Sequence, residues 1–399
     1  PLARDADQDA IDADLNGAED FRARLKAELE AAKGDRVKLN QLLVESATRA
    51  RTIEQRLVDV EGRIALLDKS QAELKASLAK RRGVLGDVLA ALLRMGREPP
   101  PALVMRPDDA LDAVRSAILL GALLPELRVE AETLAADLSE LKRVRDALAR
   151  AKENLASLGA ALKEDRARLT ALTTERQRRQ KEEHPLQPAD KAQADSLART
   201  SGDVHDLVTR LETEVAPSAQ AADEAKAAPV PTEHPKPDLA ALNDPGRLKP
   251  AMAFADAKGL LPLPVAGVRL RDFGAPDSVG GAEKGLTIAT RSGALVTAPT
   301  DGWVVYAGPF RSYGQLLIIN AGGGYHILMA GMERITVELG QFVLAGEPVA
   351  VMGRPSRPAA SGVNSASGQP QLYVEFRKDG VSIDPTPWWA ATDSRKVRG

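Results

Sequence analysis

The chain has 399 residues, enough for two or three domains, and its 54 basic and 56 acidic side chains leave a net charge of −2. This balance argues against bulk electrostatic binding to nucleic acid or anionic lipid. The absence of cysteine excludes disulfides and cysteine-based zinc sites. The sequence contains no run of about 18 apolar residues, the length that is needed to span a membrane. Because no signal segment precedes Pro1, we expect a mature or trimmed exported chain.

The first 180 residues favour two long helices. No proline occurs between Asp20 and Met95, and apolar residues alternate at steps of four and three, as in a coiled-coil seam: Ile53, Leu57, Val60, Ile64, Leu67, Leu74, Leu78 and Leu85. A second seam has a leucine at every seventh position from Leu127 to Leu169. We predict an antiparallel coiled-coil hairpin over residues 1–182, with a parallel homodimer as the alternative.

A small helical module is predicted at about 84–126, where the hairpin turns. Pro99 to Pro101 stop the first helix, and Pro107 with two following aspartates predicts the next helix start. The apolar residues on both sides either bury one another or stay partly open for a partner. The candidates for that partner contact are Leu92, Met95, Leu103, Met105 and Leu119.

Residues 183–250 lie between the hairpin and the last domain. Prolines at 185 and 188 end the coil, and an amphipathic helix is predicted at about 190–215. Its apolar face consists of Leu197, Val204, Leu207, Val208 and Leu211. This helix packs either back on the coil or on the C-terminal domain. From Ala216 to Pro250 the sequence is rich in alanine, proline and charge, which predicts a flexible linker.

Residues 251–399 contain many short apolar runs separated by glycine, a pattern typical of antiparallel β structure. Strands are expected at 287–290, 295–297, 302–308, 315–320, 326–329, 341–343, 348–352 and 371–377. The predicted fold class is therefore α + β multidomain, with the helical hairpin and its module followed by an antiparallel β domain.

Several motifs in this last domain resemble the LytM (M23-type) zinc peptidase domain. They include Ala298-Pro299-Thr300-Asp301-Gly302, Ser312-Tyr313-Gly314-Gln315, Leu372-Tyr373-Val374-Glu375-Phe376-Arg377 and Asp384-Pro385-Thr386-Pro387-Trp388. The resemblance extends over about residues 254–390 and implies the same antiparallel β fold.

The family's metal-binding residues are absent from the matching positions. That family carries H-x-G-x-D, a strand histidine and H-x-H, whereas this chain has Glu283, Thr287, Gly331, Gln371 and Tyr373 there. A catalytic zinc site of this type needs histidine and aspartate ligands. The resemblance thus implies a domain that is not an enzyme and holds no metal or cofactor. His326, the one histidine of the domain, is expected to make ordinary hydrogen bonds on a sheet face.

The whole arrangement resembles the EnvC-type murein hydrolase activators. This resemblance implies a periplasmic protein that activates zinc-dependent N-acetylmuramoyl-L-alanine amidases during cell division. It also implies that the helix at 190–215 is autoinhibitory, and that the periplasmic domain of FtsX, in the FtsE–FtsX complex, binds the coil. Peptidoglycan is a further candidate partner. The alternatives are a structural tether between the division complex and the wall, and an active zinc endopeptidase.

The family's amidase-binding groove is carried over onto Lys284, Thr287, Tyr313, Tyr373 and Arg377. Tyrosine and arginine combine contact area with directed hydrogen bonds, as interface anchors do. Tyr373 has a second reading, compatible with the first, as a side chain that fills the space left by a metal ligand.

Overall fold

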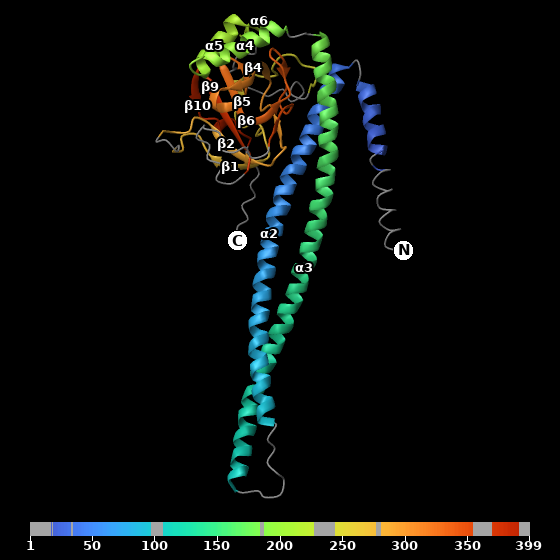
Figure 1. Cartoon of the computed structure of the whole chain (residues 1–399), viewed down its shortest axis with the longest axis vertical. Helices are drawn as coiled ribbons and strands as arrows, with labels where there is room; N and C mark the ends of the chain where they lie inside the picture. The colour runs from blue at the N-terminus through green and yellow to red at the C-terminus, as the bar shows by residue number, and fades with distance from the viewer. Residues whose placement is uncertain are drawn as a thin grey trace. The chain divides into compact units, whose positions relative to one another are not determined.

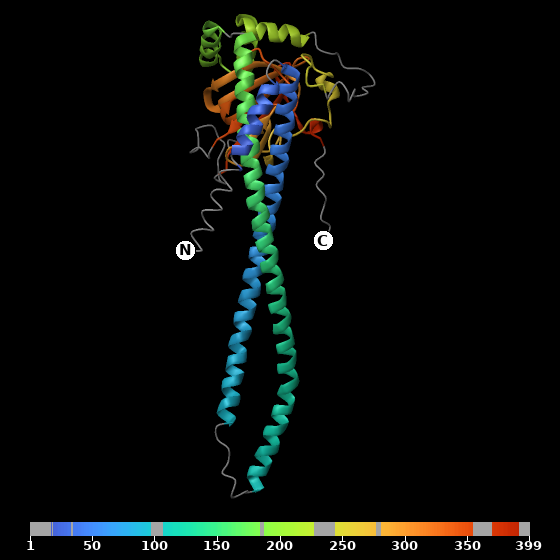
Figure 2. The same cartoon turned by 90° about the vertical axis from the view of Figure 1, so that its right-hand side faces the viewer.

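The structure of the chain is a computed structural model that describes residues 17, 19–32, 35–96, 107–183, 187–226, 244–276, 281–353 and 369–390 (Figures 1 and 2). The side chains of helical residues 84–85, 87–96 and 107–127 lie outside that description. The chain divides into two compact units, one formed by 1–55 with 160–399 and the other by 56–159. Among the described residues, no helix combines the length and the hydropathy that crossing a membrane requires.

The unit of residues 56–159 is an antiparallel helical hairpin, as predicted. It consists of the second part of α2 (Arg36–Gly96) and the first part of α3 (Pro107–Glu183), which run side by side (Figures 1 and 2). Arg81 of α2 pairs across the hairpin with Glu130 at 3.1 Å and Asp137 at 3.6 Å. The two apolar seams can therefore pair within one chain, and the alternative of a parallel homodimer is not needed.

One expectation for the helical region needs correction. The single helix expected from Asp20 is interrupted, because Asp35 is not helical and its Oδ1 accepts the Lys38 N–H at 3.1 Å, an N-cap that starts α2. The predicted module at about 84–126 falls on the end of α2 and the start of α3, and its packing lies outside the description. The candidate contact residues Leu92, Met95, Leu103, Met105 and Leu119 lie outside the described part of the chain.

The predicted helix at 190–215 is instead two helices, α4 (Pro188–Thr200) and α5 (Val204–Glu214), and a third, α6 (Ala216–Lys226), follows them. The first break follows from Gly202 and Asp203, because Asp203 Oδ1 accepts the Asp206 N–H at 2.8 Å and caps α5. The second break follows from Pro217, which has no N–H to continue α5. The linker predicted from Ala216 is thus wrong for its first part, and 227–243 lies outside the description.

The strands form one antiparallel sheet in the order β1-β2-β9-β6-β5-β4-β7, with β10 beside β9, and with β8 paired to both β3 and β6. The strands are β1 (Gly267–Arg271), β2 (Leu286–Thr290), β3 (Leu295–Thr297), β4 (Gly302–Phe310), β5 (Gly314–Gly322), β6 (Tyr325–Ile335), β7 (Phe342–Val343), β8 (Pro348–Met352), β9 (Gln371–Lys378) and β10 (Val381–Ile383). The eight predicted strands are present, whereas β1 and β10 were missed. Both carry exposed apolar residues, Val268 and Val381, and so lack a buried run.

Both faces of the central strands are buried, each in its own apolar cluster. One cluster contains Val304, Ile319, Ile327 and Val374, together with an aromatic group in which Phe254 stacks on Trp388 at 5.5 Å. The other contains Val305, Ile318, Leu328 and the apolar residues of α4, α5 and α6. Figure 1 shows these three helices, in yellow-green, lying across the sheet. Alternate residues along each strand therefore serve different cores.

The last turns of α3 are attached to the sheet domain within the same unit. Arg176 forms an ion pair with the buried carboxylate of Glu347, and Gln177 Nε2 donates to the Thr336 carbonyl at 2.7 Å. Burial raises the pKa of Glu347, while Arg176 acts in the opposite direction. The Asp301 carboxylate likewise accepts two hydrogen bonds from Arg247, at 2.7 and 2.9 Å. These buried contacts stabilise the sheet domain that carries the candidate site.

Candidate docking site on the helix-covered face

The sheet surface under α4, α5 and α6 is called here the helix-covered face. Its residues alternate along β9, β6, β5 and β4, and they pair directly across the strands. Tyr373 pairs with Ala330 and also with Thr287 on β2, so these residues share the face. Sequence reasoning placed both Thr287 and Tyr373 in a groove, and the fold brings them together.

Tyr313, Tyr373 and Arg377 are gathered at one end of this face. The Tyr313 and Tyr373 rings have centroids 6.1 Å apart. Tyr373 Oη donates to Glu375 Oε2 at 2.9 Å, and Arg377 Nε donates to Glu375 Oε1 at 2.7 Å. Ser382 on β10 donates to the same carboxylate. Lys284 is exposed just before β2 and takes no part in this set of hydrogen bonds.

Glu375 is fully buried, and it was missed among the candidate site residues. Burial first, and the Glu375 charge second, raise the pKa of Tyr373 well above its ordinary range. Burial raises the pKa of Tyr313 in the same way. Both phenols are therefore neutral hydrogen-bond donors at physiological pH, and Glu375 fixes the direction of Tyr373 and Arg377. The family motif that ends in Glu375 and Arg377 was the available sequence signal.

The five positions matched to metal ligands do not form a zinc ligand set. Thr287 is 2% exposed, the Tyr373 hydroxyl is committed to Glu375, and Glu283 Oε1 accepts from Arg271 at 2.7 Å. Gly331 has a φ of 94°, and a Cβ there would collide with the Gln371 carbonyl. Within the described ranges, no three His, Asp or Glu side chains gather as metal ligands would. These residues do not suit Zn²⁺, which favours histidine and carboxylate ligands.

The predicted apolar face of the middle helices packs on this sheet surface rather than on the coil. Leu207 and Leu211 of α5 are completely buried, and they belong to one cluster with Val305 and Leu328. The other predicted members, Leu197, Val204 and Val208, are buried in the same cluster. Ser218 of α6 adds a hydrogen bond to the Val305 carbonyl at 3.1 Å. The helices thus occupy the surface next to Tyr373.

Carboxylates of the helices also reach polar side chains of the sheet. Glu212 Oε1 accepts from Asn320 Nδ2 at 2.9 Å and lies 2.9 Å from His326 Nε2. Glu224 Oε2 accepts from Trp303 Nε1 at 2.6 Å. The expectation of ordinary hydrogen bonds for His326 is confirmed. Glu212 was missed, although its spacing of four from Val208 places it on the apolar stripe of α5, where a charge is unusual.

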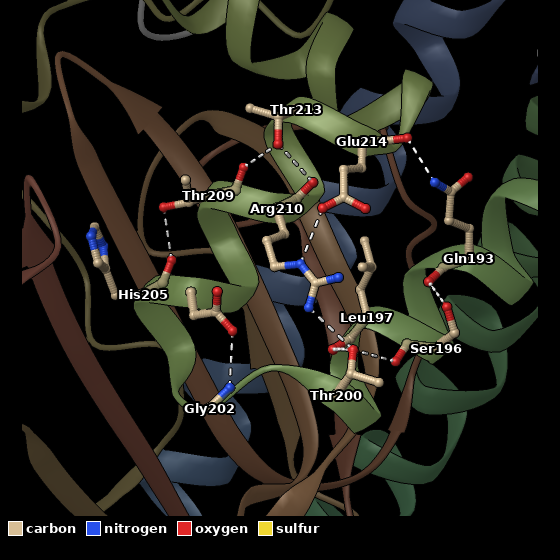
Figure 3. Close-up of polar contacts among 11 residues, drawn as sticks. Gln193, Ser196, Leu197, Thr200, Gly202, His205, Thr209, Arg210, Thr213 and Glu214 are labelled. Carbon is tan, nitrogen blue, oxygen red and sulfur yellow. Dashed lines mark hydrogen bonds and ion pairs between the residues drawn. The ribbon is translucent and has the colours of Figure 1, made fainter.

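Polar contacts on the outer side join α4 to α5 (Figure 3). Arg210 Nη1 donates to Thr200 Oγ1 at 3.2 Å, and its Nε donates to Glu214 Oε1 at 3.1 Å. Gln193 Nε2 donates to the Glu214 carbonyl at 3.0 Å. Asp206 Oδ2 accepts the Gly202 N–H at 2.9 Å. The two helices therefore hold a defined mutual arrangement, rather than contacting the sheet as separate segments.

The turn between α4 and α5 lies by the Tyr313–Arg377 end of the face. The Arg311 guanidinium donates to the Ser201 carbonyl. The Asp206 N–H lowers the pKa of Asp203, and the positive charge of Arg377 contributes in the same direction. The charge of the predicted groove arginine thus influences an acidic side chain of the covering helices.

Comparison with known proteins identifies the sheet domain. Residues 281–385 match peptidase family M23. The murein hydrolase activator EnvC of Escherichia coli strain K12 is 31% identical over 105 residues, which are 26% of this chain and 23% of EnvC. The murein hydrolase activator NlpD of Salmonella dublin is 35% identical over 123 residues, which are 31% of this chain and 29% of NlpD. The matched region is less than a third of the length of either relative.

Among solved structures, a putative M23 peptidase from Pseudomonas aeruginosa is 21% identical, covering 45% of this chain and 65% of its own, with a TM-score of 0.29. The chain thus contains an M23-type domain next to long helices, and it is similar to EnvC-type activators, as its motifs predicted.

Proposed function

We propose that this chain is a non-catalytic activator of peptidoglycan amidases, and that the helix-covered face is where the amidase docks. The observation that carries the proposal is that α5 buries its apolar side on the face that holds Tyr313, Tyr373 and Arg377. Relatives named as murein hydrolase activators, and the lack of a zinc ligand set at the matched positions, support the same function.

The covering helices are proposed to inhibit the protein. The face lies beneath apolar side chains of α4, α5 and α6, so an amidase must displace them to reach Tyr373. A polar sheet surface would need no such cover, whereas this apolar one is stable either under its own helices or under a partner. The inhibitory segment is accordingly 188–226, somewhat longer than the predicted 190–215.

Release is proposed to come from the coil. The division complex FtsE–FtsX, through the periplasmic part of FtsX, is the proposed partner at the hairpin end, and the periplasm is the proposed location. The resemblance to EnvC-type activators supports both statements. The contact between Arg176 at the end of α3 and Glu347 in the sheet domain offers a physical connection between coil and face.

The test is dye release from labelled peptidoglycan by a purified amidase from the source organism, with the activator chain added. Deleting 188–226, or introducing Leu207→Asp with Leu211→Asp, is expected to give amidase activation in the absence of the FtsE–FtsX partner, because the apolar contact between the helices and the sheet is removed. In the uncovered protein, Tyr373→Ala or Arg377→Glu is expected to abolish activation while the circular dichroism spectrum stays unchanged.

Lys284→Ala tests the exposed member of the predicted groove, and a smaller loss of activation than for Tyr373→Ala is expected, because Lys284 lies outside the Glu375 hydrogen-bond set. Two further results separate the competing functions. Stoichiometric zinc, or hydrolysis of muropeptides by the chain alone, would instead identify an endopeptidase. Peptidoglycan binding without any amidase stimulation would identify a tether. Full activation by both Tyr373→Ala and Arg377→Glu would reject docking at this face.

A further inference from the structure

Four hydrogen-bond donors form a row across the helix-covered face. Arg377 on β9 pairs directly with His326 on β6, His326 pairs with Asn320 on β5, and Asn320 pairs with Trp303 on β4. Directly paired residues of neighbouring strands point to the same side of a sheet. The row therefore runs perpendicular to the strands, and only its Arg377 end belongs to the groove that the sequence predicted.

The donors in the middle of the row are fixed in direction. Asn320 Oδ1 accepts the Gly322 N–H at 3.0 Å, which leaves its Nδ2 to point toward the covering helices. An ionised carboxylate can only accept, so the contact between His326 and Glu212 places the proton on Nε2. Trp303 is 1% exposed and its Nε1–H can only donate. The row thus presents hydrogen-bond donors that require acceptors.

Carboxylates of the chain's own helices satisfy three of these donors, whereas Arg377 donates to Glu375 on its own strand. Glu212 of α5 serves both Asn320 and His326, while Glu224 of α6 serves Trp303. The charge of Arg377 acts on Asp203 in the turn before α5. Apolar residues such as Ile318 and Leu328 flank the row, and Asn320 is only 6% exposed. The covering segment is therefore apolar where the sheet is apolar, and acidic where the sheet donates.

A partner that replaces the helices faces the same requirement. Leaving a buried donor without an acceptor costs binding free energy, whereas a hydrogen bond to a charged acceptor is among the stronger ones. Selectivity arises from this asymmetry, since a partner without an acid at this place would leave donors unpaired.

We propose that Asn320 and His326 form a second recognition point, which selects a partner segment with a carboxylate in the place of Glu212. The docking segment of the partner is then an acidic amphipathic helix, with apolar residues that match those of α5. The inference rests on the proposed function of this face as a docking site. It adds a specificity determinant away from the Tyr373 end.

The experiment measures amidase affinity in the full chain carrying Leu207→Asp and Leu211→Asp, so that effects on the covering helices do not interfere. Asn320→Leu removes the donor and is expected to weaken binding by about tenfold. Asn320→Asp keeps the shape and the acceptor for Gly322 but repels a carboxylate, so a larger loss is expected. His326→Leu provides a second position. Gln315→Leu, at the other end of β5, is the matched control and is expected to stay within about twofold.

The outcomes distinguish the two proposals. If Tyr373→Ala abolishes binding while Asn320→Leu, Asn320→Asp and His326→Leu bind normally, the face docks the amidase but the second recognition point does not exist. If Asn320→Asp binds better than Asn320→Leu, the partner group is not a carboxylate and the inference fails. If Tyr373→Ala and the row variants all bind normally, or if no amidase binds, the proposed function itself is rejected. Thermal melts of each variant check that the fold is intact.

Discussion

At the scale of single residues, the site depends on Glu375 and Gly285, neither of which was among the candidate site residues. Glu375 has no exposed surface, yet it accepts hydrogen bonds from Tyr373 and Arg377 and so orients both. Gly285 is equally necessary, because a Cβ there would meet the Tyr373 ring at 3.0 Å and collide with the Val374 carbonyl. A residue without a side chain therefore allows the tyrosine to lie against β2.

Gly285→Ala is expected to destabilise the sheet domain by roughly 1–3 kcal/mol, because a rigid methyl group must displace backbone or a packed ring. Thermal unfolding followed by circular dichroism measures the loss. Gly259→Ala is a poorer comparison, since its φ of 75° is itself strained for alanine. Gly62→Ala, in a helix with open space around the added methyl, is the control and should not destabilise. Equal melting temperatures for Gly285→Ala and the unaltered chain would contradict this account.

At the scale of elements, α5 combines an apolar stripe with a cap and a half-buried acid. Leu207 and Leu211 supply burial, Asp203 supplies the cap, and Glu212 supplies polar contacts with the sheet. Exposure of α5 thus requires the loss of three different kinds of interaction. The helix is short, so its stability comes mainly from packing on the sheet rather than from intrinsic propensity.

Asp203→Ala is expected to lower the free energy of unfolding of α5 by about 1 kcal/mol, the usual cost of removing an N-cap. Because the pKa of Asp203 is lowered in the folded state, this stabilisation is present above the ordinary aspartate pKa, and it is lost as pH falls through the folded value. Hydrogen exchange of the α5 amides should therefore be faster in Asp203→Ala near pH 7. The difference should shrink as pH falls below the ordinary aspartate pKa and toward the folded value, and a difference that does not shrink on acidification would show that the cap is not the cause.

At the scale of the whole molecule, α3 is continuous from the hairpin to the sheet domain, where Arg176 meets the buried Glu347. Removing one partner of a buried ion pair leaves a charge without compensation, at a cost of roughly 3–5 kcal/mol. The pair therefore makes the attachment of α3 sensitive to a single substitution.

Arg176→Met is expected to lower the melting temperature at pH 7. Burial already raises the pKa of Glu347, and loss of the arginine raises it further. An acid with a raised folded pKa destabilises the fold when ionised, so the variant should regain stability as pH is lowered. Adding Glu347→Gln should restore stability at pH 7, because the amide oxygen can still accept the Leu344 N–H. A variant that is equally unstable at pH 7 and pH 5 would contradict this explanation.

The sequence by itself determined the helical hairpin and the antiparallel β domain. Heptads, glycine-bounded strands and motif residues are local patterns, so they can be read without a fold. It also identified the apolar residues of α5, because their helical spacing is intrinsic to the segment. The expected linker at Ala216 was wrong for its first part because a proline-rich composition does not exclude a short helix with Pro217 in its first turn.

Only the tertiary structure decided where those residues go. The row of Arg377, His326, Asn320 and Trp303 depends on strand register, which joins residues up to 74 positions apart in the chain. The helices α4, α5 and α6 pack on the sheet rather than on the coil, and this depends on which apolar surface the fold places next to them. Long-range pairing and burial are properties of the assembled sheet, and no local pattern contains them.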